Sequence, residues 1–216
     1  RPEVVVLLAA IADVGTAERV PARATEVNVD GARKVARLCK QHNARLVFLS
    51  SEYVFRGDRG NYQEDDTPDP ATHYGRTKWQ AELAVAREAF QWSVVRTSVV
   101  YGWPLIGRQN LATAIIDRLK NGETYDGDTN TYRTPIYVDH LTEGLEQLVT
   151  NYHPGIYHIA GKDWMNMYQF ACAVAGVFDM DGSLVSPAQI SANLSPRTLP
   201  TRESEQGLRP DILGLD

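Results

Sequence analysis

A tyrosine and a lysine stand four positions apart in the stretch YGRTK, residues 74–78, and a serine, Ser51, precedes the tyrosine by 23 positions. Tyr74 and Lys78 fall at the start of a predicted helix, so their side chains share one face, one turn apart. An ammonium group near a phenol favours the phenolate and lowers the phenol pKa from about 10. Such a tyrosine can protonate a reacting oxygen, while the Ser51 hydroxyl supplies a second hydrogen bond. Pairs of this kind also occur as ordinary helix contacts, and the position after a strand ending in Ser50-Ser51 is what favours catalysis.

The elements that must position these residues alternate between strands and helices. Four short apolar runs predict buried strands, at residues 4–10, 45–50, 92–97 and 155–159. Segments with helical spacing lie at residues 28–42, 74–90, 110–121, 139–150 and 166–178. This alternation predicts an α/β fold with a doubly wound parallel (Rossmann-type) sheet, and ligands bind such sheets beyond the carboxyl ends of the strands.

Composition excludes several classes of protein. Hydrophobic residues make up 43% of the 216 residues and charged residues 23%, as in ordinary globular domains. A net charge of −5 lacks the basic surface of a nucleic-acid binder, so no nucleic-acid partner is expected. No apolar run approaches the roughly 20 residues that span a bilayer, and the first residues lack the flanks of a signal peptide, so we expect a cytoplasmic protein with no membrane partner. The histidines show no metal-ligand spacing, and no metal site is expected.

Five stretches of the chain together resemble the extended short-chain dehydrogenase/reductases, most closely their dTDP-4-dehydrorhamnose reductase-like branch. These stretches are LSSEYVFRG, YQEDDTPDPATHYGRTKWQAE, VVRTSVVYG, YRTPIYVDHL and GIYHIAG. The resemblance covers nearly the whole chain. The resemblance implies reduction of the keto group of a nucleotide-activated deoxysugar, such as dTDP-4-dehydrorhamnose, by NADPH or NADH, for polysaccharide biosynthesis. It makes Ser51, Tyr74 and Lys78 catalytic, with Tyr74 as proton donor. It also places Tyr74 and Lys78 among the residues that bind the cofactor, with Lys78 holding the cofactor ribose. The resemblance is also compatible with a homodimer.

The same resemblance assigns residues to the cofactor. Ala9 and Ala10 match small residues that let the cofactor approach the backbone, although tight strand-to-helix packing explains them equally well. Asn28 matches an asparagine near the active site, and it is also a good N-cap for the helix predicted to begin there. Thr97 and Ser98, at the end of a predicted strand, complete the expected cofactor contacts.

Further residues are assigned to the substrate: Glu52, Tyr53, Trp103, Asn110 and Arg133, with Arg108 as a neighbour in the same lobe. Arg133 matches an arginine near the nucleotide-sugar phosphates, with an ordinary surface arginine as the alternative. Trp103 could equally serve packing. Glu52 stands where the reductase branch usually has aspartate, and related dehydratases have a second carboxylate next to it. A single carboxyl favours reduction over dehydration.

The predicted lobes have soft boundaries. Residues 1–100 and 132–165 are expected to form the NAD(P)-binding sheet domain, and residues 101–131 and 166–216 the substrate-binding lobe. The two alternatives to a reductase are a sugar-nucleotide epimerase and a non-catalytic regulatory subunit like that of methionine adenosyltransferase.

One expected motif is missing from the sequence. Neither G-x-x-G-x-x-G nor G-x-G-x-x-G occurs, although a Rossmann domain grips its dinucleotide with such a turn. Compared with the family, a segment on the order of 60 residues, about two strand-helix units, is absent from the start. We expect the sequence to be part of a longer enzyme. A natural truncation that has lost cofactor binding and strands supplied by another chain are the alternatives.

Overall fold

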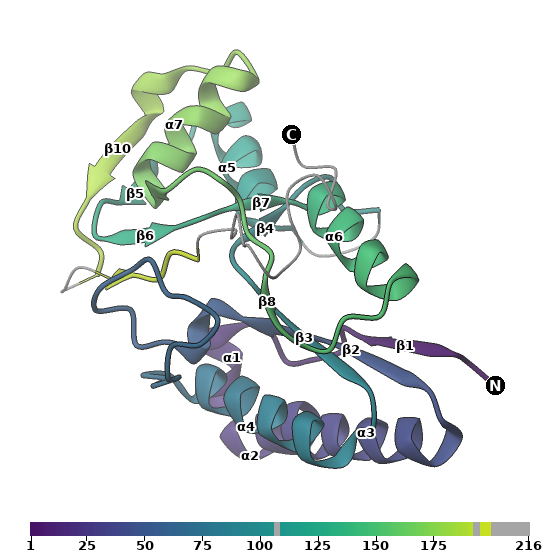
Figure 1. Ribbon diagram of the computed structural model, residues 1–216. Coiled ribbons are helices and arrows are strands. Elements are labelled where there is room, and N and C mark those ends of the chain that lie inside the picture. The colour runs from purple at the N-terminus through teal and green to yellow at the C-terminus, as the bar shows by residue number, and fades with distance from the viewer. Residues whose placement is uncertain (106–108, 192–194, 200–216) are drawn as a thin grey trace.

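A parallel sheet of four strands, in the order β1-β2-β3-β8, forms the centre of the computed structural model, which describes residues 1–105, 109–191 and 195–199 (Figure 1). The strand bounds are Val4–Leu7 for β1, Arg45–Ser51 for β2, Trp92–Thr97 for β3 and Gly155–His158 for β8. All three pairings are parallel. The predicted α/β fold with a parallel sheet is confirmed.

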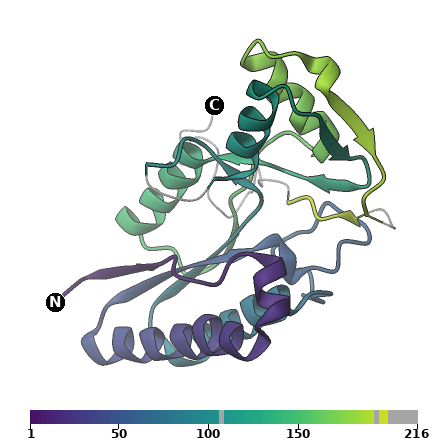
Figure 2. The ribbon, with the colours of Figure 1, turned by 180° about the vertical axis from the view of Figure 1, so that it is seen from behind.

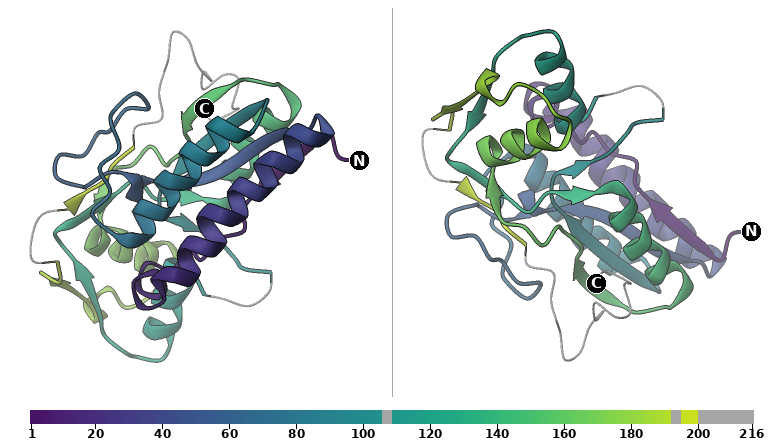
Figure 3. Two further views of the ribbon diagram at one scale, coloured as in Figure 1. Left: turned by 90° about the horizontal axis from the view of Figure 1, so that it is seen from below. Right: turned by 90° about the horizontal axis from the view of Figure 1, so that it is seen from above.

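Helices cover both faces of this sheet (Figures 2 and 3). α3 (Gly31–His42) and α4 (His73–Glu88) run side by side across one face, and α6 (Val138–Thr150) lies on the other. Side chains alternate along β2, so Leu46 and Phe48 pack in the core with α3 and α4, whereas Val47 packs in the core with α6. Because both faces are covered, the strand is apolar without a polar alternation.

The chain between β1 and α3 is mostly helical. Three short segments precede α3: α1 (Val14–Arg19), α2 (Pro21–Thr25) and the π-helical turn η1 (Glu26–Asp30). A carboxylate oxygen of Asp13 caps α1 by accepting a hydrogen bond of 2.8 Å from the Thr16 amide. The predicted helix start at residue 28 is therefore wrong, and Asn28 is not an N-cap. The small buried residues here, Ala17 and Ala24, leave little apolar periodicity for sequence reasoning to detect.

A smaller lobe lies beside the carboxyl ends of β2 and β3 (Figure 1). Its two helices, α5 (Leu111–Lys120) and α7 (Met167–Val177), share an apolar core that includes Ile115 and Phe170. Its strands are β5 (Tyr125–Asp128), β6 (Thr131–Arg133), β9 (Met165–Asn166), β10 (Val185–Ala188) and β11 (Ser195–Pro196). β4 (Val100–Tyr101) pairs with β7 (Ile136–Tyr137) where the lobe meets the sheet. The lobe thus forms one wall of the space above the strand ends.

Within the described residues, no three His, Cys, Asp or Glu side chains gather as a metal site. None of the helices described here is long and apolar enough to cross a membrane.

Candidate functional site

A cavity of about 630 Å³ opens at the carboxyl ends of β2 and β3. Its walls are the segment after β1, the first turns of α4, the short 3₁₀ helix η2 (Glu52–Val54) and the start of α5. It brings together the three predicted catalytic residues, Ser51, Tyr74 and Lys78. Six other predicted site residues also line it: Ala10, Glu52, Tyr53, Thr97, Ser98 and Asn110. Its size is that of a small-molecule site.

Tyr74 lies in the first turn of α4, which Thr72 caps by accepting a hydrogen bond of 3.0 Å from the Gly75 amide. Its side chain is buried, and its ring meets the ring of Tyr53 edge to face at 5.7 Å between centroids. Burial raises the pKa of Tyr74 to about 12, against the opposing effect of its hydrogen bond with the Ser51 side chain. The prediction that Lys78 lowers this pKa is therefore wrong for this state. The phenol is a protonated donor at neutral pH.

Lys78 lies one turn further along α4 than Tyr74, and its ammonium group is hydrogen-bonded to β2. Its ammonium group donates a hydrogen bond of 2.6 Å to the Leu49 carbonyl and lies 4.3 Å from the centroid of the Phe48 ring. Burial lowers the pKa of Lys78 to about 8, with the Glu82 carboxylate acting in the opposite direction. An ammonium group has three N–H donors, so this geometry leaves two for a ligand in the cavity.

Glu52 and Arg133 form an ion pair inside the protein. The Arg133 Nε lies 2.9 Å from a Glu52 carboxylate oxygen, and both side chains are almost completely buried. Burial raises the pKa of Glu52 to about 7, although the positive charges of Arg133 and Arg197 and a Ser98 hydrogen bond act to lower it. The alternative that Arg133 is a surface residue is wrong. The predicted phosphate contact of Arg133 stays a prediction, with its Nε group paired with the Glu52 carboxylate.

Asn28 connects two parts of the site through side-chain hydrogen bonds, from a position outside the cavity lining. Its side-chain oxygen accepts from the Ile11 amide at 2.8 Å, and its amide group donates to the Ile11 carbonyl at 3.1 Å and to the Thr77 hydroxyl at 2.9 Å. The segment after β1 is thereby tied to α4 at the position just before Lys78. The side chain is buried in these contacts, so it acts on the site through the backbone.

Four predicted site residues fall outside the cavity lining: Asn28 and Arg133, described above, and Ala9 and Trp103. Ala9 is exposed, and only its neighbour Ala10 lines the cavity. Trp103 is 59% exposed, packs edge to face on Phe178 and lines a separate apolar cavity of about 320 Å³ between α5 and α7. Trp103 thus packs on Phe178 outside the main cavity, and its substrate contact stays a prediction. Arg108 lies outside the described residues.

Asn110 lines the cavity and also stabilises the start of α5. It caps α5 through reciprocal hydrogen bonds with Thr113, and its amide group donates to the Gly102 carbonyl. Sequence reasoning missed one further residue, Arg197, whose guanidinium carbon lies 4.8 Å from the centroid of the Tyr53 ring. It comes from a stretch without periodicity, so the sequence carried no signal for it.

Gly75 permits the close approach of α4 to η2 that brings Tyr74 beside Tyr53. A Cβ at this position would meet the Tyr53 carbonyl oxygen at 2.0 Å. Gly75→Ala is expected to lower the free energy of unfolding by about 3 kcal/mol, because the backbone must move apart. Gly176→Ala is the matched control in α7, where a Cβ meets no described atom within 4 Å, and a gain of about 0.5–1 kcal/mol is expected. Urea unfolding checks both, and equal midpoints would contradict the close approach.

Known proteins resemble this chain in sequence. The chain is 30% identical over 193 residues to methionine adenosyltransferase 2 subunit beta of Bos taurus, covering 87% of this chain and 58% of that protein. It is 29% identical to the spore coat polysaccharide biosynthesis protein SpsK of Bacillus subtilis, covering 97% and 75%. The chain thus spans little more than half the length of the first relative.

A solved structure supports the same relationship. The dTDP-4-dehydrorhamnose reductase (rfbD) of Bacillus anthracis in complex with NADP superposes with a TM-score of 0.83 at 28% identity, over 93% of this chain and 72% of that one. A family model described as the RmlD substrate binding domain matches residues 1–204. With nearly its whole length matched, the chain belongs to the RmlD substrate binding domain family.

Proposed function

We propose that the protein reduces the keto group of a nucleotide-activated deoxysugar with NADPH or NADH. The observation that carries this proposal is the placement of the Tyr74 phenol, bonded to the Ser51 side chain, on a cavity that Lys78 also lines. A reduction of this type needs a proton donor next to the carbonyl oxygen, and these residues supply one.

The chain's residues fit the nicotinamide end of such a cofactor. Lys78 has N–H donors available for ribose hydroxyls, and Ala10 presents a small side chain on the opposite wall. The Gly-rich turn that would bind the pyrophosphate is not part of this sequence. When bound, the cofactor supplies a hydride to the keto carbon.

Tyr74 and Ser51 then act on the carbonyl oxygen. As negative charge develops on that oxygen, the Tyr74 phenol donates its proton and the Ser51 hydroxyl donates a hydrogen bond. Tyr53 and Asn110 also line the cavity and are the residues we assign to the sugar.

A coupled assay on the complete protein tests this function. Oxidation of NADPH, followed by its absorbance, is expected when a nucleotide-linked 4-keto-6-deoxysugar is added. Lys78→Met is expected to raise the KM for NADPH by about 10-fold or more, because a charge-assisted hydrogen bond to the ribose is lost. Cofactor binding without turnover of any keto sugar would contradict the proposal.

A non-catalytic subunit is the second candidate, favoured by the identity with methionine adenosyltransferase 2 subunit beta. In that case the protein binds a methionine adenosyltransferase catalytic subunit and keeps the cavity for binding alone. Sedimentation of the complete protein with such a catalytic subunit distinguishes the two, because the reductase is expected to sediment independently of it.

A further inference from the structure

The segment 195–199 fastens the small lobe to the loop that follows η2. The Arg197 amide donates to the Tyr132 carbonyl of β6 at 3.1 Å, and the Leu199 amide donates to the Thr134 hydroxyl at 3.3 Å. On the other side, the Tyr62 amide donates to the Thr198 carbonyl at 3.0 Å and the Asn61 amide to the Thr198 hydroxyl at 2.7 Å. The segment 195–199 therefore contacts both the small lobe and the loop that follows η2.

The Arg197 side chain is fixed by the backbone of that loop. Its Nε donates to the Phe55 carbonyl at 3.1 Å, and an Nη donates to the Arg56 carbonyl at 2.6 Å. Gly57, with φ of +87°, closes over it so tightly that a Cβ there would lie 2.7 Å from the Arg197 side chain. The guanidinium group is held in one orientation by contacts 141 and 142 residues away in sequence.

This orientation places the guanidinium group against the ring of Tyr53. Its central carbon lies 4.8 Å from the ring centroid, and that of Arg133 lies 5.5 Å from the same centroid. The Tyr53 ring in turn meets the Tyr74 ring edge to face, and both line the cavity. A continuous path of contacts runs from the small lobe through Arg197 and Tyr53 to Tyr74.

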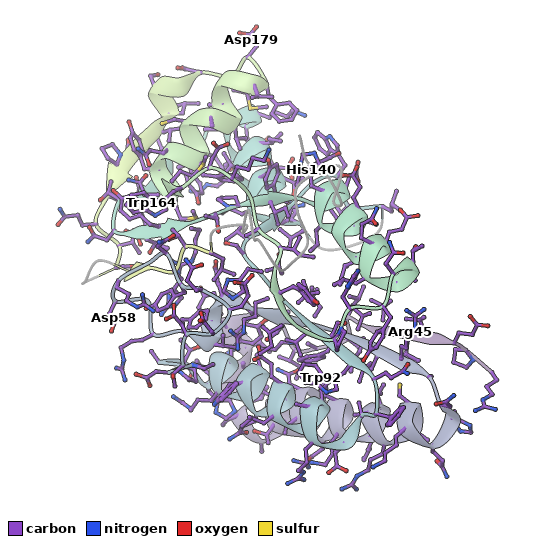
Figure 4. All side chains as sticks on the ribbon, viewed as in Figure 1. Arg45, Asp58, Trp92, His140, Trp164 and Asp179 are labelled. Atoms are coloured by element: carbon purple, nitrogen blue, oxygen red, sulfur yellow. The ribbon has the colours of Figure 1, made fainter. Side chains whose placement is uncertain are left out.

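Arg197 carries its charge in a buried region of the protein, beside Arg133 and the Glu52 carboxylate. Its hydrogen bonds to two backbone carbonyls and the nearby carboxylate favour the charged guanidinium group there. Figure 4 shows side chains filling the region between the loop that carries Asp58 and the lobe that carries Trp164. The same orientation places the guanidinium group over the face of the Tyr53 ring, as a cation–π contact.

We propose that Arg197 is a positioning residue that holds the Tyr53 ring against Tyr74 and so sets the shape of the cavity at the proton donor. Its effect on catalysis rests on the proposed reductase function. Its effect on the Tyr53 ring does not, and can be measured without turnover.

The test compares Arg197→Met with Thr198→Val in the full chain. Both variants loosen the segment, because Thr198→Val removes the hydrogen bond from Asn61, but only Arg197→Met removes the contact with Tyr53. With ¹³C-labelled tyrosine, the nuclear Overhauser effect between the Tyr53 and Tyr74 rings is expected to persist in Thr198→Val and to disappear in Arg197→Met. Arg197→Lys keeps a cation over the ring and is expected to retain most of it.

In the complete enzyme, Arg197→Met is expected to lower kcat by about 10-fold, and Thr198→Val by less than about 2-fold, because a small misplacement of reacting groups costs this much. An unchanged ring contact in Arg197→Met, or its equal loss in both variants, would overturn the inference. If the ring contact responds as expected while the wild type turns over no keto sugar, the positioning role stands and the reductase function fails.

Discussion

Replacing Tyr74 by phenylalanine is expected to lower the rate of keto-sugar reduction by about 10³-fold, within the range typical of general acid catalysis. The substitution removes the phenol that donates the proton and leaves the ring, which packs with Ala17, Ala24 and Tyr53. The hydroxyl's hydrogen bond is with the Ser51 side chain, so the free energy of unfolding should change by only about 1 kcal/mol. Cofactor affinity should stay near the wild-type value because Lys78 is untouched.

Single-turnover kinetics of the complete enzyme measure this loss, with cofactor binding measured separately by fluorescence. Tyr157→Phe is the matched control, because the Tyr157 hydroxyl donates to the Pro154 carbonyl at 3.2 Å on β8 and does not line the cavity. That variant should keep full activity. A folded Tyr74→Phe protein with wild-type turnover would remove Tyr74 from the mechanism and favour the non-catalytic subunit.

The fold could be predicted where local patterns follow the packing. The apolar run of β2 and the helical spacing of α4 to α7 arise from burial against the sheet or within the lobe, so the predicted bounds lie within a few residues of those found. The segment from Val14 to Asp30 escaped prediction because its contacts are made by small side chains and by Asn28, whose hydrogen bonds go to distant backbone.

The site residues fall into the same two groups, those with a local sequence pattern and those without one. Ser51, Tyr74 and Lys78 are set by strand ends and a helix start, which a sequence reveals. The burial of Arg133 could not be predicted from the sequence, because its partner, Glu52, lies 81 positions away and pairing at that separation leaves no local pattern. Arg197 is the extreme case, with contacts 142 positions away. The direction of the Tyr74 pKa shift depends on burial, which the spacing of a Tyr-x-x-x-Lys pair does not contain.

The second large effect concerns Glu52 and the pH dependence of stability. Its pKa is about 7 in the folded protein and near 4.5 otherwise, so the folded state binds more protons than the unfolded state between these values. Stability is therefore lost as pH rises through this window, fully present below about 4.5 and gone above about 7. A pKa raised from 4.5 to about 7 corresponds to about 3 kcal/mol.

Glu52→Gln keeps the shape of the protonated side chain and cannot ionise. The free energy of unfolding of Glu52→Gln minus that of the wild type should increase by about 3 kcal/mol from pH 4 to pH 8, because only the wild type acquires a buried negative charge. Urea unfolding of both proteins across this range measures the difference, in which groups common to both cancel. The charged and titratable groups facing Glu52 are Arg133, Arg197 and Tyr74, and none of them changes charge over this range.

Glu88→Gln supplies a control of opposite sign. Glu88 lies at the surface beside Arg37 and Arg87, whose hydrogen bonds lower its pKa to about 2. Its folded-state pKa is below the unfolded value, so the carboxylate stabilises the protein above about pH 4.5. The free energy of unfolding of Glu88→Gln minus that of the wild type should therefore decrease as pH rises. A Glu52→Gln difference that is flat with pH, or that follows Glu88→Gln, would mean that Glu52 stays ionised through its pairing with Arg133. The carboxylate would then be a fixed charge of the site rather than one that takes up a proton near neutral pH.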